Sequence, residues 1–185
     1  HRLLETVASA SGRPVTYGLI EVESDPEDAT VMIGESERAL ARGIPIYPQV
    51  TARGGGQLYM LEGYHIFLLK PSYRAIAHLP LEQRVEAMRE PGRRAAILAE
   101  DFDEGAYARD AMTLSLLRYM LAHNAQSYIL DSPLDFEPGP ERRLDALAAA
   151  AGMSPEAYLY DHYTSGNGND FNVNFVVNYA HGSLE

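Results

Sequence analysis

Residues 11–20 read SGRPVTYGLI, and residues 43–53 read GIPIYPQVTAR. Each stretch opens with glycine and proline, continues through β-branched or aromatic residues, and ends on polar groups. The segment between them is polar at first and then carries apolar residues at helical spacing. This pattern predicts consecutive β-α-β units, with strands over 15–22 and 44–50 and a helix over 25–42.

Polar side chains gather on and just after these two predicted strands. Parallel strands joined by helices carry their functional residues at the carboxyl ends of the strands. The first candidates for a site are therefore Thr16, Tyr17, Gln49, Thr51 and Arg53.

Arg53 and Gln49 are the sharper candidates, because a guanidinium is the natural bidentate partner of a carboxylate and an amide can bind beside it. The structural alternatives are that Gln49 caps its strand and that Arg53 pairs with an acid in the loop. Thr16 and Tyr17 are weaker candidates, because threonine and tyrosine in strands mostly serve packing.

The last predicted strand covers residues 171–179, where asparagine alternates with valine and phenylalanine. Alternation places side chains on opposite faces, so Asn172, Asn174 and Asn178 predict a partly polar strand. Asn178 lies at the carboxyl end of this strand and is a further candidate for substrate binding.

Between these strands, residues 54–165 predict mostly loop and helix, inserted into the β-α-β framework. Residues 51–71 are loop-like, and Gly54, Gly55 and Gly56 predict a flexible hinge. We expect Glu82, Arg84, Glu86 and Arg89 to form a solvated helix face. The other predicted elements are helices over 2–10, 72–98 with breaks near two prolines, 107–123, 142–151 and 154–163, and a strand over 127–130.

Composition excludes several classes of function. With 46% hydrophobic and 22% charged residues, the chain has the balance of a globular protein. A net charge of −11 argues against nucleic acid as a partner, because phosphate binding needs a basic face. The chain has no cysteine and no apolar run long enough for a membrane span, so we expect a cytoplasmic protein that does not engage membranes.

Several segments, in order along the chain, resemble the amidohydrolase superfamily, in the branch of N-acyl-D-amino-acid deacylases and D-aminoacylase-like proteins. The residues 48–50 (PQV) with 53–58 (RGGGQL) are the most specific part. The other segments are 71–74 (PSYR), 79–84 (LPLEQR), 91–94 (PGRR), 151–157 (AGMSPEA) with Tyr160 and Asp161, and 178–184 (NYAHGSL).

The resemblance implies an α/β fold in which the chain is a contiguous part of a (β/α)8 TIM-type barrel, about strands five to seven, with a helical insertion. A complete barrel needs about 250 residues, more than the 185 present. A barrel segment exposes strand edges and apolar surface, so we also expect self-association.

The implied activity is hydrolysis of an N-acyl amide bond, most specifically in N-acyl-D-amino acids, by water activated on a divalent metal such as zinc. We expect the 185-residue piece alone to be inactive. Two alternatives stay open: another amide or cyclic-amide hydrolase of the same fold, such as a dihydroorotase-like or urease-like protein, and a non-catalytic binding domain derived from that fold.

The metal ligands of that family are not evident here. No His-x-His motif occurs, the two predicted β-α-β strands contain no histidine, and the histidines show no spacing typical of a metal site. His181 lies where relatives often carry an acid, which leaves a charged role there open.

We therefore predict that this chain binds no stoichiometric transition metal. The measurement is elemental analysis of purified, tag-free protein. One zinc per chain would contradict the prediction.

Overall fold

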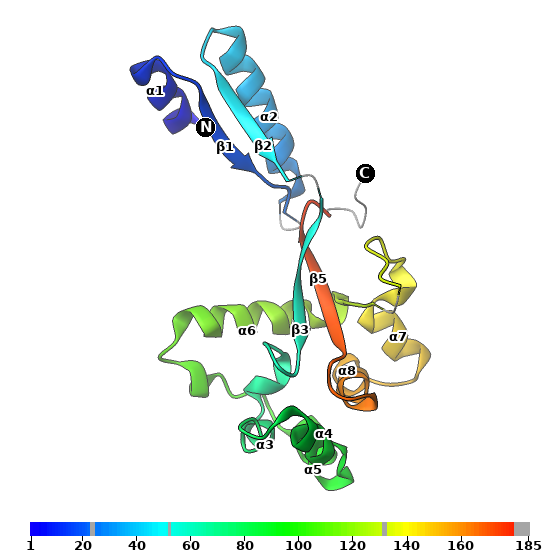
Figure 1. The fold of residues 1–185 in the computed structure, drawn as a ribbon. Coiled ribbons are helices and arrows are strands. Elements are labelled where there is room, and N and C mark those ends of the chain that lie inside the picture. The colour runs from blue at the N-terminus through cyan, green and yellow to red at the C-terminus, as the bar shows by residue number, and fades with distance from the viewer. Residues whose placement is uncertain (23–24, 52, 131–132, 180–185) are drawn as a thin grey trace. The chain divides into compact units, whose positions relative to one another are not determined.

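The computed structural model describes residues 1–22, 25–51, 53–130 and 133–179, and they form a mixed α/β fold (Figure 1). The chain divides into two compact units. Unit 1 comprises His1–Gly56 and Phe175–Glu185, and unit 2 comprises Gln57–Asn174. Among the described residues, no helix combines the length and the apolar character needed to cross a membrane.

Unit 1 begins with a β-α-β arrangement, as the sequence predicts. Its elements are α1 (Arg2–Ser11), β1 (Val15–Leu19), α2 (Pro26–Ala41) and β2 (Ile46–Val50). The strands β1 and β2 are parallel neighbours, with Val15 opposite Ile46 and Leu19 opposite Val50. Helix α1 ends at Gly12, whose φ of 63° lies in the left-handed region that glycine adopts without strain.

The small core of unit 1 lies between the helices and one face of the two-stranded sheet. Ala8 of α1, Ala39 of α2 and Ile46 of β2 are buried at its centre, and Val15 and Tyr17 pack around them. Two alanines at the centre let both helices approach the strands closely. The helices therefore cover one sheet face and leave the other exposed.

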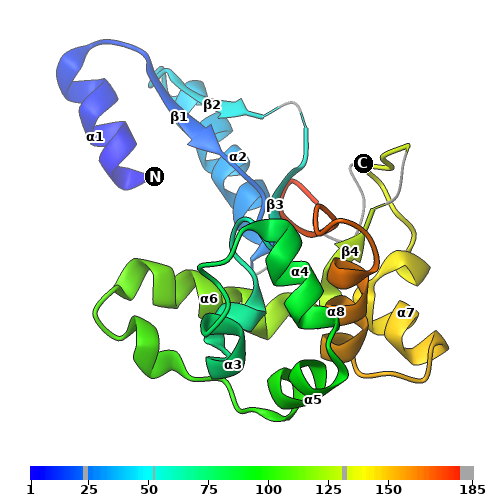
Figure 2. The same ribbon diagram turned by 60° about the horizontal axis from the view of Figure 1, so that its bottom comes forward.

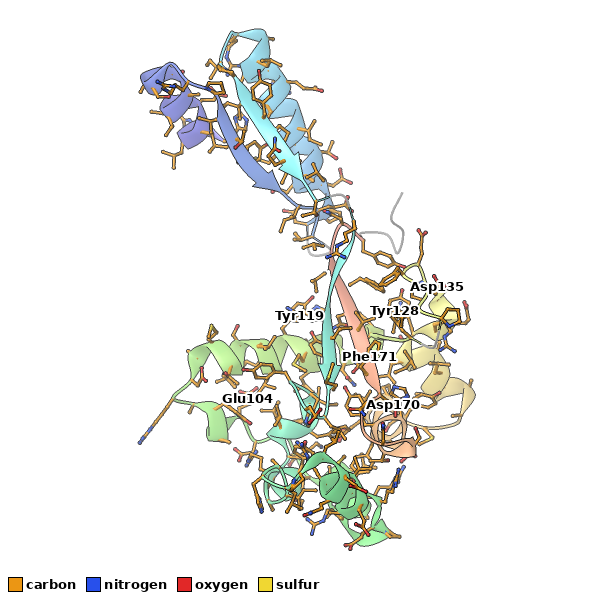
Figure 3. The ribbon with its side chains drawn as sticks, in the orientation of Figure 1. Glu104, Tyr119, Tyr128, Asp135, Asp170 and Phe171 are labelled. Atoms are coloured by element: carbon orange, nitrogen blue, oxygen red, sulfur yellow. The ribbon has the colours of Figure 1, made fainter. Side chains whose placement is uncertain are left out.

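A second sheet has the strand order β3-β5-β4, and its strands β3 and β5 each cross the division between the units. The strands are β3 (Gly55–Met60), β4 (Tyr128–Ile129) and β5 (Phe171–Val177). Strand β4 is antiparallel to β5, with Tyr128 opposite Val173. In unit 2, Figure 3 shows the labelled Tyr128 and Phe171 on these strands.

Strand β3 corrects the sequence interpretation of residues 54–56 as a flexible hinge. Gly55 and Gly56 belong to the strand. A Cβ built on Gly55 would lie only 2.6 Å from the Cγ2 of Val177, so the glycine serves a close approach of β3 to β5 rather than a hinge.

Unit 2 is mainly helical, and α4 packs on α5 while α7 packs on α8 (Figure 2). Its helices are η1 (Ile66–Leu69), α3 (Pro71–Arg74), α4 (Leu81–Arg89), α5 (Pro91–Ala99), η2 (Glu104–Tyr107), α6 (Ala111–His123), η3 (Asn124–Gln126), η4 (Pro140–Arg142), α7 (Leu144–Ala150) and α8 (Pro155–Ser165).

Side-chain caps begin two of the longer helices of unit 2. The carboxylate of Asp110 accepts from the backbone N–H of Thr113 at 3.0 Å, and the hydroxyl of Ser154 accepts from that of Ala157 at 3.2 Å. An exposed ion pair joins η2 to α6, where Glu104, labelled in Figure 3, accepts from Arg118 at 2.6 Å. The Arg118 hydrogen bond lowers the pKa of Glu104.

The core of unit 2 combines aromatic rings with satisfied polar groups. Phe67 and Tyr163 are fully buried, and a hydrogen bond joins the Tyr163 hydroxyl to the side-chain oxygen of Asn172. The Asn172 amide donates to the Ser127 hydroxyl at 2.7 Å. Buried polar groups need such partners, so this chain of hydrogen bonds specifies how β5 packs on α8.

Two arginines that the sequence placed on a solvated helix face make hydrogen bonds within the fold, and of these Arg84 is half-buried while Arg89 is exposed as expected. Arg84 donates to the carbonyl of Leu61 at 2.9 Å and to the hydroxyl of Tyr73 at 3.0 Å. Arg89 donates to the carbonyl of Thr164 at 2.8 Å. Charge alternation along a helix could not distinguish Arg84 from the exposed Glu82 and Glu86 beside it.

His65 lies at the centre of this core and is 1% exposed. Its Nε2 is 2.9 Å from the Tyr73 hydroxyl. Burial, reinforced by the nearby charge of Arg84, lowers the pKa of His65 from 6.5 to about 3. The native state therefore holds this imidazole neutral at pH values where the unfolded chain protonates it.

We predict that the stability of unit 2 falls as the pH falls from about 6.5 towards 3, because the unfolded state then binds a proton that the native state excludes. The free energy of unfolding should decrease by up to about 1.4 kcal/mol per pH unit from this residue. Urea denaturation of the protein and of His65→Gln across this range measures the difference in slope. His78→Gln, at an exposed histidine, is the matched control. Equal slopes for the protein and His65→Gln would refute the assignment.

Candidate functional site

The exposed face of the β1–β2 pair carries two of the predicted site residues. Thr16 pairs with Tyr47 and Gly18 with Gln49, so these four residues share one face. All four are exposed. The alternating burial of β1 follows directly from the helices on the opposite face.

Tyr17 lies on that opposite, helix-covered face. Its hydroxyl donates to the carbonyl of Met32 at 3.2 Å and lies 2.9 Å from the hydroxyl of Ser36, both in α2. The structure therefore does not bring Tyr17 together with Thr16 and Gln49. Its contacts tie β1 to α2.

Gln49 and Arg53 offer uncommitted polar groups at the carboxyl end of β2. The Gln49 amide makes only a 3.3 Å contact to the carbonyl of the preceding residue, Pro48. In the part of the chain that the structure describes, the Arg53 guanidinium has neither a hydrogen bond nor an ion pair, and Arg53 is exposed. The alternative was that Arg53 pairs with an acid in the loop, but no described acid forms this pair.

Asn178 joins the segments that follow β1 and β2. Its side-chain oxygen accepts from the backbone N–H of Glu21 at 3.0 Å. Its side-chain nitrogen donates to the Thr51 hydroxyl at 2.5 Å and lies 3.4 Å from the carbonyl of Arg53. Thr51, Arg53 and Asn178 are thereby brought together.

The contact between Asn178 and Glu21 spans 157 residues of sequence, and sequence reasoning missed it. No local sequence pattern predicts a contact between residues so far apart in the chain. The end-of-strand position of Asn178 was the one available signal. His181 and the remainder of residues 180–185 lie outside the described residues.

One group in unit 1 has the composition of a metal site. The ligand atoms of His1, Glu5 and Glu35 lie within 4.8 Å of one another. However, Glu5 is already paired with Arg42 at 2.8 Å and Glu35 with Arg38 at 2.7 Å. The hydrogen bond from Arg38 lowers the pKa of Glu35. Two cations thus balance the two carboxylates, and the group belongs to α1 and α2 rather than to the strand ends.

The described residues at the strand ends therefore do not fit the catalytic metal of an amidohydrolase. The exposed strand face offers threonine, glycine, tyrosine and glutamine, none of which is a usual zinc ligand. Among the described residues, the carboxyl ends of β1 and β2 carry exposed polar side chains and no set of metal ligands.

Two open grooves are lined by other residues. One, of about 540 Å³, is lined by Leu81, Val85 and Arg89 of α4 and by the turn after α8. The other, of about 580 Å³, runs along α1. Neither includes a predicted site residue.

Comparisons with protein-family models, with curated proteins and with solved structures found no match to this chain. The functional argument therefore depends on the residues and their geometry.

We predict that Tyr17→Phe destabilises unit 1 by about 1 kcal/mol, because it removes two hydrogen bonds to α2. The same variant should leave the KM for any substrate of the strand face unchanged. Denaturant unfolding and steady-state kinetics measure the two effects. Tyr47→Phe, on the exposed face, is the control and should change stability by less than about 0.5 kcal/mol. A higher KM with unchanged stability for Tyr17→Phe would restore Tyr17 to the site.

Proposed function

We propose that this chain is part of an amidohydrolase that hydrolyses the N-acyl amide bond of N-acyl amino acids, most specifically of N-acyl-D-amino acids. It contributes the substrate-facing wall of a (β/α)8 barrel. The observation that carries the proposal is the parallel β1–β2 pair, with Thr16 and Gln49 on its exposed face and, after β2, an Arg53 whose guanidinium has no partner among the described residues.

The chemistry of these three side chains matches that of an N-acyl amino acid. The guanidinium of Arg53 can hold the carboxylate through two parallel hydrogen bonds. The side-chain amide of Gln49 can both donate to and accept from the amide of the substrate, and the hydroxyl of Thr16 can do the same. Gly18, opposite Gln49, has no atom within 4 Å of a Cβ placed on it, which leaves room for a substrate group.

The role proposed for this chain is to bind and orient the substrate. Positioned binding groups raise the rate by holding the reacting amide in one geometry. The described residues supply no ligand set for a metal at this end, so no chemical step is assigned to them.

The test is hydrolysis by the full-length protein of matched N-acyl-D- and N-acyl-L-amino acids, with and without a chelator. We expect turnover of the D series, lost with the chelator. Turnover of cyclic amides alone would favour the related hydrolase activity. Saturable binding of N-acyl amino acids without turnover would favour the non-catalytic binding domain, with which the lack of metal ligands on the strand face also agrees.

We predict that Arg53→Ala lowers kcat/KM by about two to three orders of magnitude, because it leaves a substrate carboxylate without its partner. Arg53→Lys should recover only part of this loss, since lysine lacks the planar fork. The loss should shrink for substrates in which an amide replaces the carboxylate. An equal loss on both substrate types would show that Arg53 supports the structure instead.

A further inference from the structure

Asn178 has an unusual backbone conformation for a residue with a side chain. Asn178 is the one non-glycine residue with a positive φ among the described residues, and its φ is 53°. Asparagine tolerates this left-handed conformation better than most residues. The conformation directly follows β5, at the point where the side chain turns towards Glu21 and Thr51.

Both the oxygen and the nitrogen of the Asn178 side-chain amide form hydrogen bonds within the protein. The oxygen accepts from Glu21, whose carbonyl in turn accepts from the backbone N–H of Asn178 at 2.8 Å. The nitrogen donates to Thr51 through its hydroxyl at 2.5 Å and its carbonyl at 3.3 Å. Only an amide offers a donor and an acceptor in this arrangement, because a carboxylate would face the Thr51 carbonyl with negative charge.

These contacts fix the start of the segment that carries Arg53. The Asn178 nitrogen lies 3.4 Å from the Arg53 carbonyl, and the Thr51 hydroxyl lies 3.4 Å from the same carbonyl. Within the described part of the chain, the Arg53 side chain makes no hydrogen bond or ion pair. The direction of the side chain therefore depends on the backbone of Arg53, whose carbonyl Asn178 contacts at 3.4 Å.

We infer that Asn178 is a positioning residue, which binds no substrate itself and presents Arg53 to the substrate carboxylate. The inference rests on the proposed function and replaces the expectation that Asn178 touches substrate. A pre-organised guanidinium loses less freedom on binding than one on a loose segment. Substitution of Asn178 should therefore weaken the binding of carboxylate substrates.

The kinetic test uses Asn178→Gly in the full-length protein, which keeps the left-handed backbone and removes the amide. We expect KM for carboxylate substrates to rise about tenfold while kcat changes less than about threefold. In an Arg53→Ala background the same substitution should leave KM unchanged, because the two residues act on one interaction. An equal rise of KM in both backgrounds would overturn the inference.

A second variant and a matched control separate positioning from general damage. Asn178→Asp keeps the size and the backbone tolerance but loses the donors, and it should raise KM in the same way. Asn167→Gly removes a comparable side-chain contact to a backbone N–H, in an exposed turn of unit 2, and should leave KM unchanged. A rise of KM with the control but not with Asn178→Asp would count against Asn178.

A spectroscopic arm does not depend on activity. Asn178→Gly should speed hydrogen exchange at the Glu21 amide and lower the NMR order parameter of the Arg53 backbone, whereas Asn167→Gly should change neither. If the wild-type protein hydrolyses no N-acyl amino acid, the proposed function fails and this arm alone decides on positioning. An unchanged order parameter at Arg53 in Asn178→Gly would overturn the inference.

Discussion

The hydrogen-bonded register between β1 and β2 decides which side chains of unit 1 can meet a ligand. In this register Thr16, Gly18, Tyr47 and Gln49 share the exposed face, and Ile46 lies buried on the other. A slip of one residue would exchange the two faces. The slip is opposed by the core, because it would expose Ile46 and bury polar groups beside the helices.

The same constraint explains how the strand ends are connected. Because the strands are parallel, the segments that follow β1 and β2 leave the sheet at the same edge. Asn178 can therefore hold Glu21 and Thr51 with one side chain. The residues that connect the strand ends and the exposed groups proposed to bind substrate are thus separate sets, and Arg53 belongs to the second set.

In unit 2, several residues that carry the resemblance to amidohydrolases have structural partners. Arg94 donates to both carboxylate oxygens of Asp161, at 2.8 and 2.9 Å, which joins α5 to α8. Tyr160 donates to the carbonyl of Met88 at 2.8 Å. These contacts give the motifs a packing role within the unit. The chemical part of the proposal therefore depends on unit 1.

The β-α-β arrangement could be predicted from sequence, because the apolar periodicity and the glycine-proline punctuation are local signals. The left-handed Gly12 that ends α1 is a signal of the same local kind. Strand alternation predicts that Tyr17 and Thr16 lie on opposite faces, but it does not say which of the two faces the helices cover. Strand β3 was missed, because its glycines depend on the close approach of Val177 more than 100 residues away. The contacts of Asn178 were missed because they also join distant segments.

The central claim is that the carboxyl ends of β1 and β2 form a carboxylate-binding surface. NMR titration of the protein with an N-acetyl-D-amino acid tests it most directly. The account predicts saturable shift changes at Thr16, Gly18, Gln49 and Arg53, reduced when the ligand carries an amide in place of its carboxylate. Shift changes confined to residues 57–174, or equal changes with both ligands, would contradict it.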